Sequence, residues 1–163
     1  MLAVLLLSLA SLAADLREGV MGTKWGTNED FPRPEGFESC LHRPQPSVEW
    51  ECRKQLGEVP VVVHFQWEPT HKQLYGVFIF AEGVDNCLTL SGILTSAWGE
   101  SKPTNPKKVG KLDPRFWDHG DVLVSWGYTP ATGECFAYPF SLPARKAVEA
   151  AKAVEAAKAA EGL

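Results

Sequence analysis

The chain has 163 residues, of which 45% are hydrophobic, so it is long enough for one domain with a proper core and too short for two. Its formal net charge of -4 provides no large basic field, which argues against nucleic acid as a partner. The composition therefore predicts a single domain with terminal appendages.

Residues 1–13 form an apolar run that only two serines interrupt. The run is shorter than the about 20 residues that span a bilayer, but it suits the h-region of a signal peptide. Ser11 and Ala13 supply the small residues expected before a cleavage at Ala14, although no Lys or Arg precedes the run. We expect a secreted or organelle-lumen protein with no membrane span in the mature chain. The alternative is an N-terminal segment packed against a partner or a membrane.

Four cysteines, an even number in a chain that looks exported, predict two disulfides. No Cys-x-x-Cys motif is present, which argues against structural zinc. Among the three possible pairings we favour Cys40–Cys52, which closes a short loop onto the first strand. The remaining sulfurs, those of Cys87 and Cys135, would then meet across the sheet.

Residues 14–46 show no hydrophobic periodicity and are rich in Gly, Pro, Asn and Asp. This composition predicts an extended N-terminal strap. Three aromatic residues are expected to pin the strap over the core: Trp25, Phe31 and Phe37.

The β domain is predicted to cover residues 47–140. Alternation of apolar and polar residues predicts strands at 47–53, 61–67, 122–128 and 134–140. Residues 74–81 are apolar on both faces, which predicts a central strand covered on both sides.

Two further segments complete this domain. Residues 87–98 are interpreted as one long strand or two short ones with a bulge at Gly92, and residues 100–121 as a long connection. Six or seven strands joined by turns make the fold class mainly β, an antiparallel β-sandwich or barrel.

Residues 141–163 form an Ala/Lys/Glu-rich tail. After Pro143, three near-repeats of six residues predict a C-terminal α-helix over about 144–161. A six-residue step places successive lysines about 240° apart around the axis, so the charges form no stripe. The tail is therefore predicted to be a solvated spacer or a helix docked on a partner rather than a coiled coil.

No catalytic residue, cofactor or metal site is expected. A metal site would require His64, His71 and His119 to converge with Asp118 or Asp121, and nothing in their spacing requires this. The chain has no Gly-x-Ser-x-Gly motif, and its cysteines are expected to be oxidised.

Six tryptophans exceed what the core of a small domain needs. Some of them fall at strand ends or in loops, where they would either bind a ligand or seal the end of the core. The predicted binding site therefore lies at the ends of the core and comprises His71, Trp98, Trp117, Asp118 and His119.

These patterns favour a secreted or lumenal, non-catalytic binding module for a protein or a carbohydrate. One alternative is an accessory subunit of a larger assembly, docked through the strap and the C-terminal helix. The other is a small lipocalin-like carrier or a hydrolase.

Overall fold

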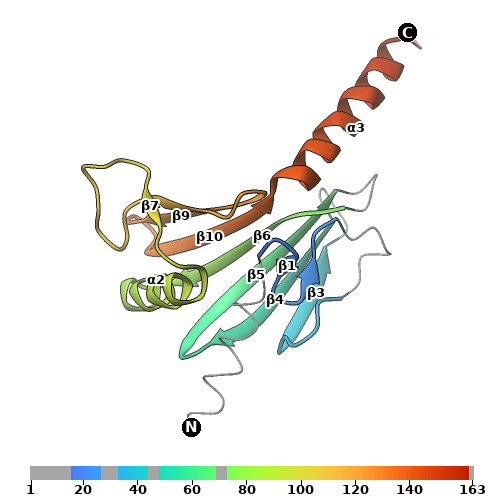
Figure 1. Cartoon of the computed structure of the whole chain (residues 1–163). Coiled ribbons are helices and arrows are strands. Elements are labelled where there is room, and N and C mark those ends of the chain that lie inside the picture. The colour runs from blue at the N-terminus through green and yellow to red at the C-terminus, as the bar shows by residue number, and fades with distance from the viewer. Residues whose placement is uncertain (1–15, 27–32, 44–47, 69–72, 162–163) are drawn as a thin grey trace.

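A computed structural model describes residues 16–26, 33–43, 48–68 and 73–161. Its main element is an eight-stranded antiparallel sheet of order β3-β4-β5-β6-β10-β9-β8-β7, accompanied by a two-stranded sheet, β1-β2 (Figure 1). The strands are β1 (Gly19–Val20), β2 (Thr23–Lys24), β3 (Ser39–Arg43), β4 (Val48–Leu56), β5 (Val59–Glu68), β6 (Gln73–Glu82), β7 (Lys102–Pro103), β8 (Arg115–Asp118), β9 (Val122–Thr129) and β10 (Glu134–Ser141). The helices are α2 (Val84–Trp98) and α3 (Leu142–Glu161).

The large sheet consists of two meanders of four strands, each followed by a helix. Strands β3 to β6 lead into α2, and strands β7 to β10 lead into α3. The last strands of the two meanders, β6 and β10, pair antiparallel at the centre of the sheet. Residues that are far apart in the chain therefore become direct neighbours along this central pairing.

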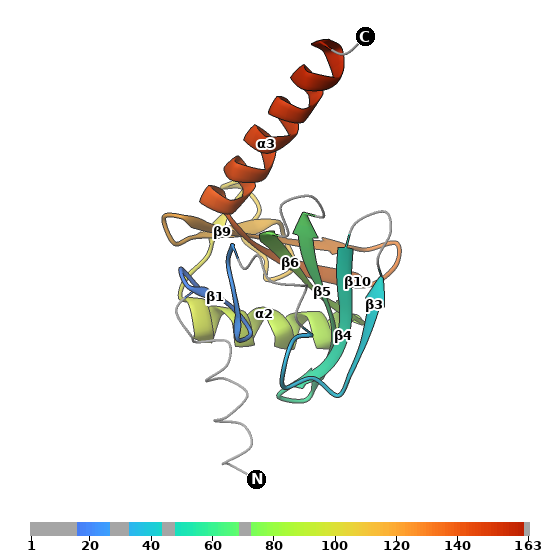
Figure 2. The same ribbon diagram turned by 90° about the vertical axis from the view of Figure 1, so that its right-hand side faces the viewer.

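One face of the sheet is covered by α2, which crosses in front of the strands in Figure 2 and contacts β5, β6 and β10. The strands contribute large buried side chains to this layer, among them Phe65, Trp67 and Ile79. The N-terminal segment with β1 and β2 adds to the same core through Leu16, Val20 and Met21.

The interpretation of residues 87–98 as strand is wrong, because this segment is most of helix α2. The buried side chains of α2 recur at intervals of three or four, the period of one helix face: Cys87, Leu90, Ser91, Leu94 and Trp98. Gly83 and Gly99 bound the helix with φ of 89° and 82°. Gly92 lies inside α2 rather than at a bulge.

Both expected disulfides are present. Cys40 and Cys52 are register partners on β3 and β4, and their bond ties the edge strand to its neighbour. The Cys87–Cys135 bond ties α2 to β10, so Cys87 is borne by a helix instead of a strand. The pairing is confirmed.

The mainly β class with a C-terminal helix is also confirmed, and the sheet is not a closed barrel. The strap contains β1, β2 and β3, and the long connection at residues 100–121 contains β7 and β8. Trp25 and Phe37 pack against the core as expected, whereas Phe31 lies outside the described residues.

Helix α3 begins on the sheet and then leaves it. Ala144 and Val148 are buried, and the Ala144 N–H donates to Ser141 Oγ at 3.3 Å. Beyond Val148 the helix is almost entirely exposed and projects away from the sheet (Figures 1 and 2). The sequence predicts a helix over about residues 144–161, and α3 (Leu142–Glu161) confirms this prediction.

The two disulfides are expected to differ in their contribution to stability. Cys87–Cys135 spans 48 positions and Cys40–Cys52 spans 12, so by loop entropy the first should stabilise by about 1 kcal/mol more. We predict a larger loss in the free energy of urea unfolding for C87A/C135A than for the matched control C40A/C52A. An equal or larger loss in the control would contradict this prediction.

Candidate ligand-binding face

The face of the large sheet turned away from α2 carries a group of half-buried aromatic side chains. We call this surface the open face and define it by Val62, His64, Phe78, Phe80, Phe136 and Tyr138, all of intermediate exposure. Successive residues of a strand point to opposite faces, so these six alternate with core residues such as Val63, Ile79 and Ala137. The open face is therefore a direct consequence of the packing of α2 on the other side.

This arrangement corrects one prediction for the strand at residues 74–81. The strand, β6, is central, as predicted. Its second face is not covered along its length, because α3 meets β6 only through its first turns. The apolar side chains on that face therefore remain partly exposed.

Four rings of the open face and its α3 end form a continuous stack across β6 and β10. Phe80 stacks on Phe78 with centroids 5.5 Å apart and planes 14° apart. Phe78 stacks on Tyr138 at 3.9 Å and 13°, and Tyr138 on Phe140 at 5.2 Å and 28°. We call these four residues the aromatic stack. At its α3 end, the Arg145 guanidinium lies 5.5 Å from the Phe140 centroid.

Two glycines beneath the rings make room for them. A Cβ on Gly76 would lie 2.6 Å from Cε2 of Tyr138, and a Cβ on Gly127 would lie 2.7 Å from Cε1 of Phe136. The rings therefore lie flat on the backbone of the neighbouring strand. Such cross-strand coverage compensates for the missing side chain of a strand glycine.

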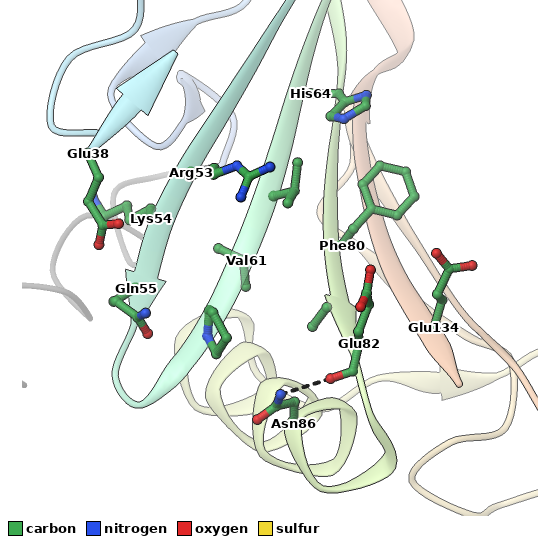
Figure 3. Close-up of a pocket in the computed structure, with 13 residues that line it drawn as sticks. Glu38, Arg53, Lys54, Gln55, Val61, His64, Phe80, Glu82, Asn86 and Glu134 are labelled. Carbon is green, nitrogen blue, oxygen red and sulfur yellow. Dashed lines mark hydrogen bonds between the residues drawn. The ribbon is translucent and has the colours of Figure 1, made fainter. Parts of the chain in front are cut away.

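At the other end of the aromatic stack, Phe80 lines a cavity of about 760 Å³ that opens to solvent (Figure 3). Its lining includes apolar and charged side chains from β4, β5, β6 and β10: Arg53, Val62, His64, Phe80, Glu82 and Glu134. We call this cavity the Phe80 pocket. Most of the lining residues are polar or charged, and the apolar ones include Val62 and Phe80.

The charges of the Phe80 pocket are segregated. Glu82 and Glu134 are register partners on β6 and β10, and both side chains extend along the Phe80 side of the pocket in Figure 3. Arg53 enters from β4 on the opposite side. Lys54 also lines the pocket, but its Nζ lies 5.3 Å from the Phe37 ring centroid.

The environment of the aromatic stack also changes the acidity of Tyr138. Burial, reinforced by the neighbouring Tyr75 and opposed by Arg145, raises the pKa of Tyr138 to about 12. The hydroxyl is therefore neutral at physiological pH, and Tyr138 is suited to packing and hydrogen bonding rather than to proton transfer.

The sequence-predicted site lies elsewhere, and the structure brings only part of it together. Trp98 and Trp117 are 6% and 1% exposed, pack edge to face at 5.9 Å, and Trp117 Nε1 donates to Gly99 O at 2.8 Å. These rings seal one end of the core, which was the alternative role foreseen for them. His71 lies outside the described residues.

Asp118 is the last residue of β8, and His119 lies in the turn between β8 and β9. The Gly120 N–H donates to Asp118 Oδ1 at 3.0 Å, so this carboxylate stabilises the turn. His119 Nε2 is buried without a hydrogen-bond partner among the described residues. No group of three metal-ligating side chains occurs in the part of the chain that the structure describes.

The residues that sequence reasoning missed are those of the open face. The signal was an alternation of aromatics at Phe78 and Phe80 and again at Phe136, Tyr138 and Phe140. On a strand this period of two places all members of each set on one face. No protein-family model, curated protein or solved structure matches the chain. The site is therefore argued from its own geometry.

The contact between Gly76 and Tyr138 gives a testable prediction. In G76A the new methyl group must displace a ring held between Phe78 and Phe140, which should lower the free energy of unfolding by about 1–3 kcal/mol. The matched control is G92A in α2, where a Cβ meets nothing within 4 Å. This control should raise stability by about 0.5–1 kcal/mol in the same urea titration. Equal effects of the two variants would contradict the described ring placement.

The pKa of Tyr138 predicts an alkaline loss of stability. The pKa of an unfolded tyrosine is about 10, whereas burial raises the pKa of folded Tyr138 to about 12. Its contribution is fully present below the unfolded pKa and is lost as pH rises from there through the folded pKa. Thermal melts across this window should show a loss that is smaller in Y138F. The same loss in both proteins would count against the prediction.

Proposed function

We propose that the protein is a secreted or lumenal, non-catalytic binding module whose ligand docks on the open face. The observation that carries this proposal is the aromatic stack, which ends in a solvent-open pocket with charged walls. Aromatic side chains that are partly exposed on a rigid scaffold are favoured in binding sites, because they contribute large contact areas with little loss of conformational entropy.

The proposed compartment is supported by the two disulfides, since such bonds form and persist mainly in oxidising environments. No free cysteine occurs among the described residues. None of the described helices has the length and apolar character needed to cross a membrane. The apolar run at residues 1–13, whose structure is not described, supports export through its sequence.

The alternative functions have less support. A lipocalin-like carrier encloses its ligand inside a closed barrel, whereas this sheet is open and α2 packs on its core face. A hydrolase that uses a hydroxyl or thiol nucleophile would need one near the substrate, and the residues lining the Phe80 pocket include no Ser, Thr or Cys. An accessory subunit would rely mainly on α3, because Leu16, Val20 and Met21 of the strap are buried in the protein's own core.

The proposal predicts which backbone amides will shift when a ligand binds. In ¹⁵N-resolved NMR titrations with soluble oligosaccharides and peptides, a binding ligand should shift amides of β5, β6 and β10. F80A should weaken binding about tenfold or more, because it removes the aromatic ring that lines the pocket. The matched control L88A removes an exposed side chain of α2 and should leave affinity unchanged.

Two results would contradict the proposal. One is a set of ligands whose shifts map to α2 or to the β8–β9 turn and whose affinity does not respond to F80A. The other is turnover of chromogenic glycosides or esters by the purified protein, because a binding module should release every ligand unchanged.

A further inference from the structure

The two ends of the aromatic stack differ in the groups that lie against their terminal rings. At the Phe140 end, the ring carries the guanidinium of Arg145 at 5.5 Å. At the Phe80 end, Phe80 stacks on Phe78, and His64 lies beside it with ring centroids 5.2 Å apart and planes at 63°. No Lys or Arg of the described part of the chain lies over Phe80, and this end of the stack lines the Phe80 pocket.

The side chains beside this ring provide the complementary charge for a cation. Glu82 and Glu134 are directly opposite each other in the antiparallel register. Like charges in this position repel, and because both side chains are exposed, water and salt screen part of this repulsion. Within the described residues neither carboxylate makes an ion pair. A bound cation would relieve this repulsion, so the pair favours a positively charged ligand.

Neither Arg53 nor Lys54 provides a cation over the Phe80 ring. Arg53 comes from β4, two strands from Phe80 in the register, and no cation–π contact joins it to Phe80 among the described residues. The ammonium group of Lys54 lies over Phe37 instead. Next to Phe80, the acidic side chains on β6 and β10 are Glu82 and Glu134, and no described ion pair neutralises either of them.

We propose that the Phe80 pocket binds an organic cation, an ammonium or guanidinium group that rests on Phe80 between Glu82 and Glu134. This inference rests on the proposed function and names its ligand class. Arg145 on Phe140 provides the same chemistry within the chain, at the opposite end of the same stack. The cation is either a free small molecule or a Lys or Arg side chain of a protein, because both present the same group.

The test is an NMR titration of the full-length ¹⁵N-labelled protein with tetramethylammonium and with tert-butanol, a neutral molecule of similar size. Tetramethylammonium should shift the amides around Phe80, Glu82 and Glu134, and tert-butanol should bind at least about tenfold more weakly. An Nα-acetyl-arginine amide distinguishes the two sources. Tighter binding of this compound indicates a protein side chain, and tighter binding of tetramethylammonium indicates a small cation.

Three variants separate the parts of the proposed site. E82Q/E134Q keeps the shape of both side chains and should weaken cation binding about tenfold or more, while its melting temperature is unchanged or raised because the repulsion is gone. F80L should weaken binding several-fold by removing the ring. E155Q, on the exposed part of α3, is the matched control and should not change affinity.

Equal affinity for tetramethylammonium and tert-butanol, or unchanged cation affinity in E82Q/E134Q, would overturn the inference. A neutral oligosaccharide that binds the open face in place of any cation would also overturn it, but would leave the proposed binding function standing. Failure of the proposed function differs from this, because no ligand of any class would then map to the open face.

Discussion

The fold depends on the packing of one helix against one face of the large sheet. α2 buries Cys87, Leu90, Leu94 and Trp98 against the strands, and the Cys87–Cys135 bond fixes it to β10. Each buried leucine contributes about 1.5–3 kcal/mol through the hydrophobic effect. Once this face is occupied, strand geometry commits every second residue of β5, β6 and β10 to the other side. Core and candidate site are therefore the two faces of the same strands.

No second layer covers the open face along its length. Its side chains are held in place by contacts between aromatic rings and the backbone beneath them. Tyr138 and Phe136 lie over Gly76 and Gly127, where any side chain would displace them. Stacked pairs contribute about 0.5–1.5 kcal/mol each beyond their buried area. The open face is thus held rigid without a second covering layer, and a rigid aromatic surface loses little entropy when it binds. The same contacts serve stability and the proposed binding.

The features that were predicted correctly are those that depend on short stretches of the sequence. The strands around Val63 and Val124, the tail helix and both disulfide pairings follow from alternation, helix propensity and cysteine spacing. Helix α2 was missed because its dense apolar run conceals a period of three to four that is clear only once its buried residues are known. The Phe80 pocket was missed for a different reason. It depends on the pairing of β6 with β10, and no short-range pattern specifies that two strands from separate meanders will be neighbours.

This central pairing also explains why the charged wall of the pocket lies where it does. Within each meander, the paired strands follow one another in the chain. Strands β6 and β10 are separated in the chain by α2 and β7 to β9, and their pairing places Cys135 opposite Ala81 and Glu134 opposite Glu82. Two facing carboxylates oppose folding, whereas one opposite charge at either position would favour it. Residues that oppose the local structure in which they lie, as these two like charges do, are found mainly at functional sites. The pair lies beside an aromatic ring at the mouth of a cavity, where a cationic ligand would turn the repulsion into binding free energy.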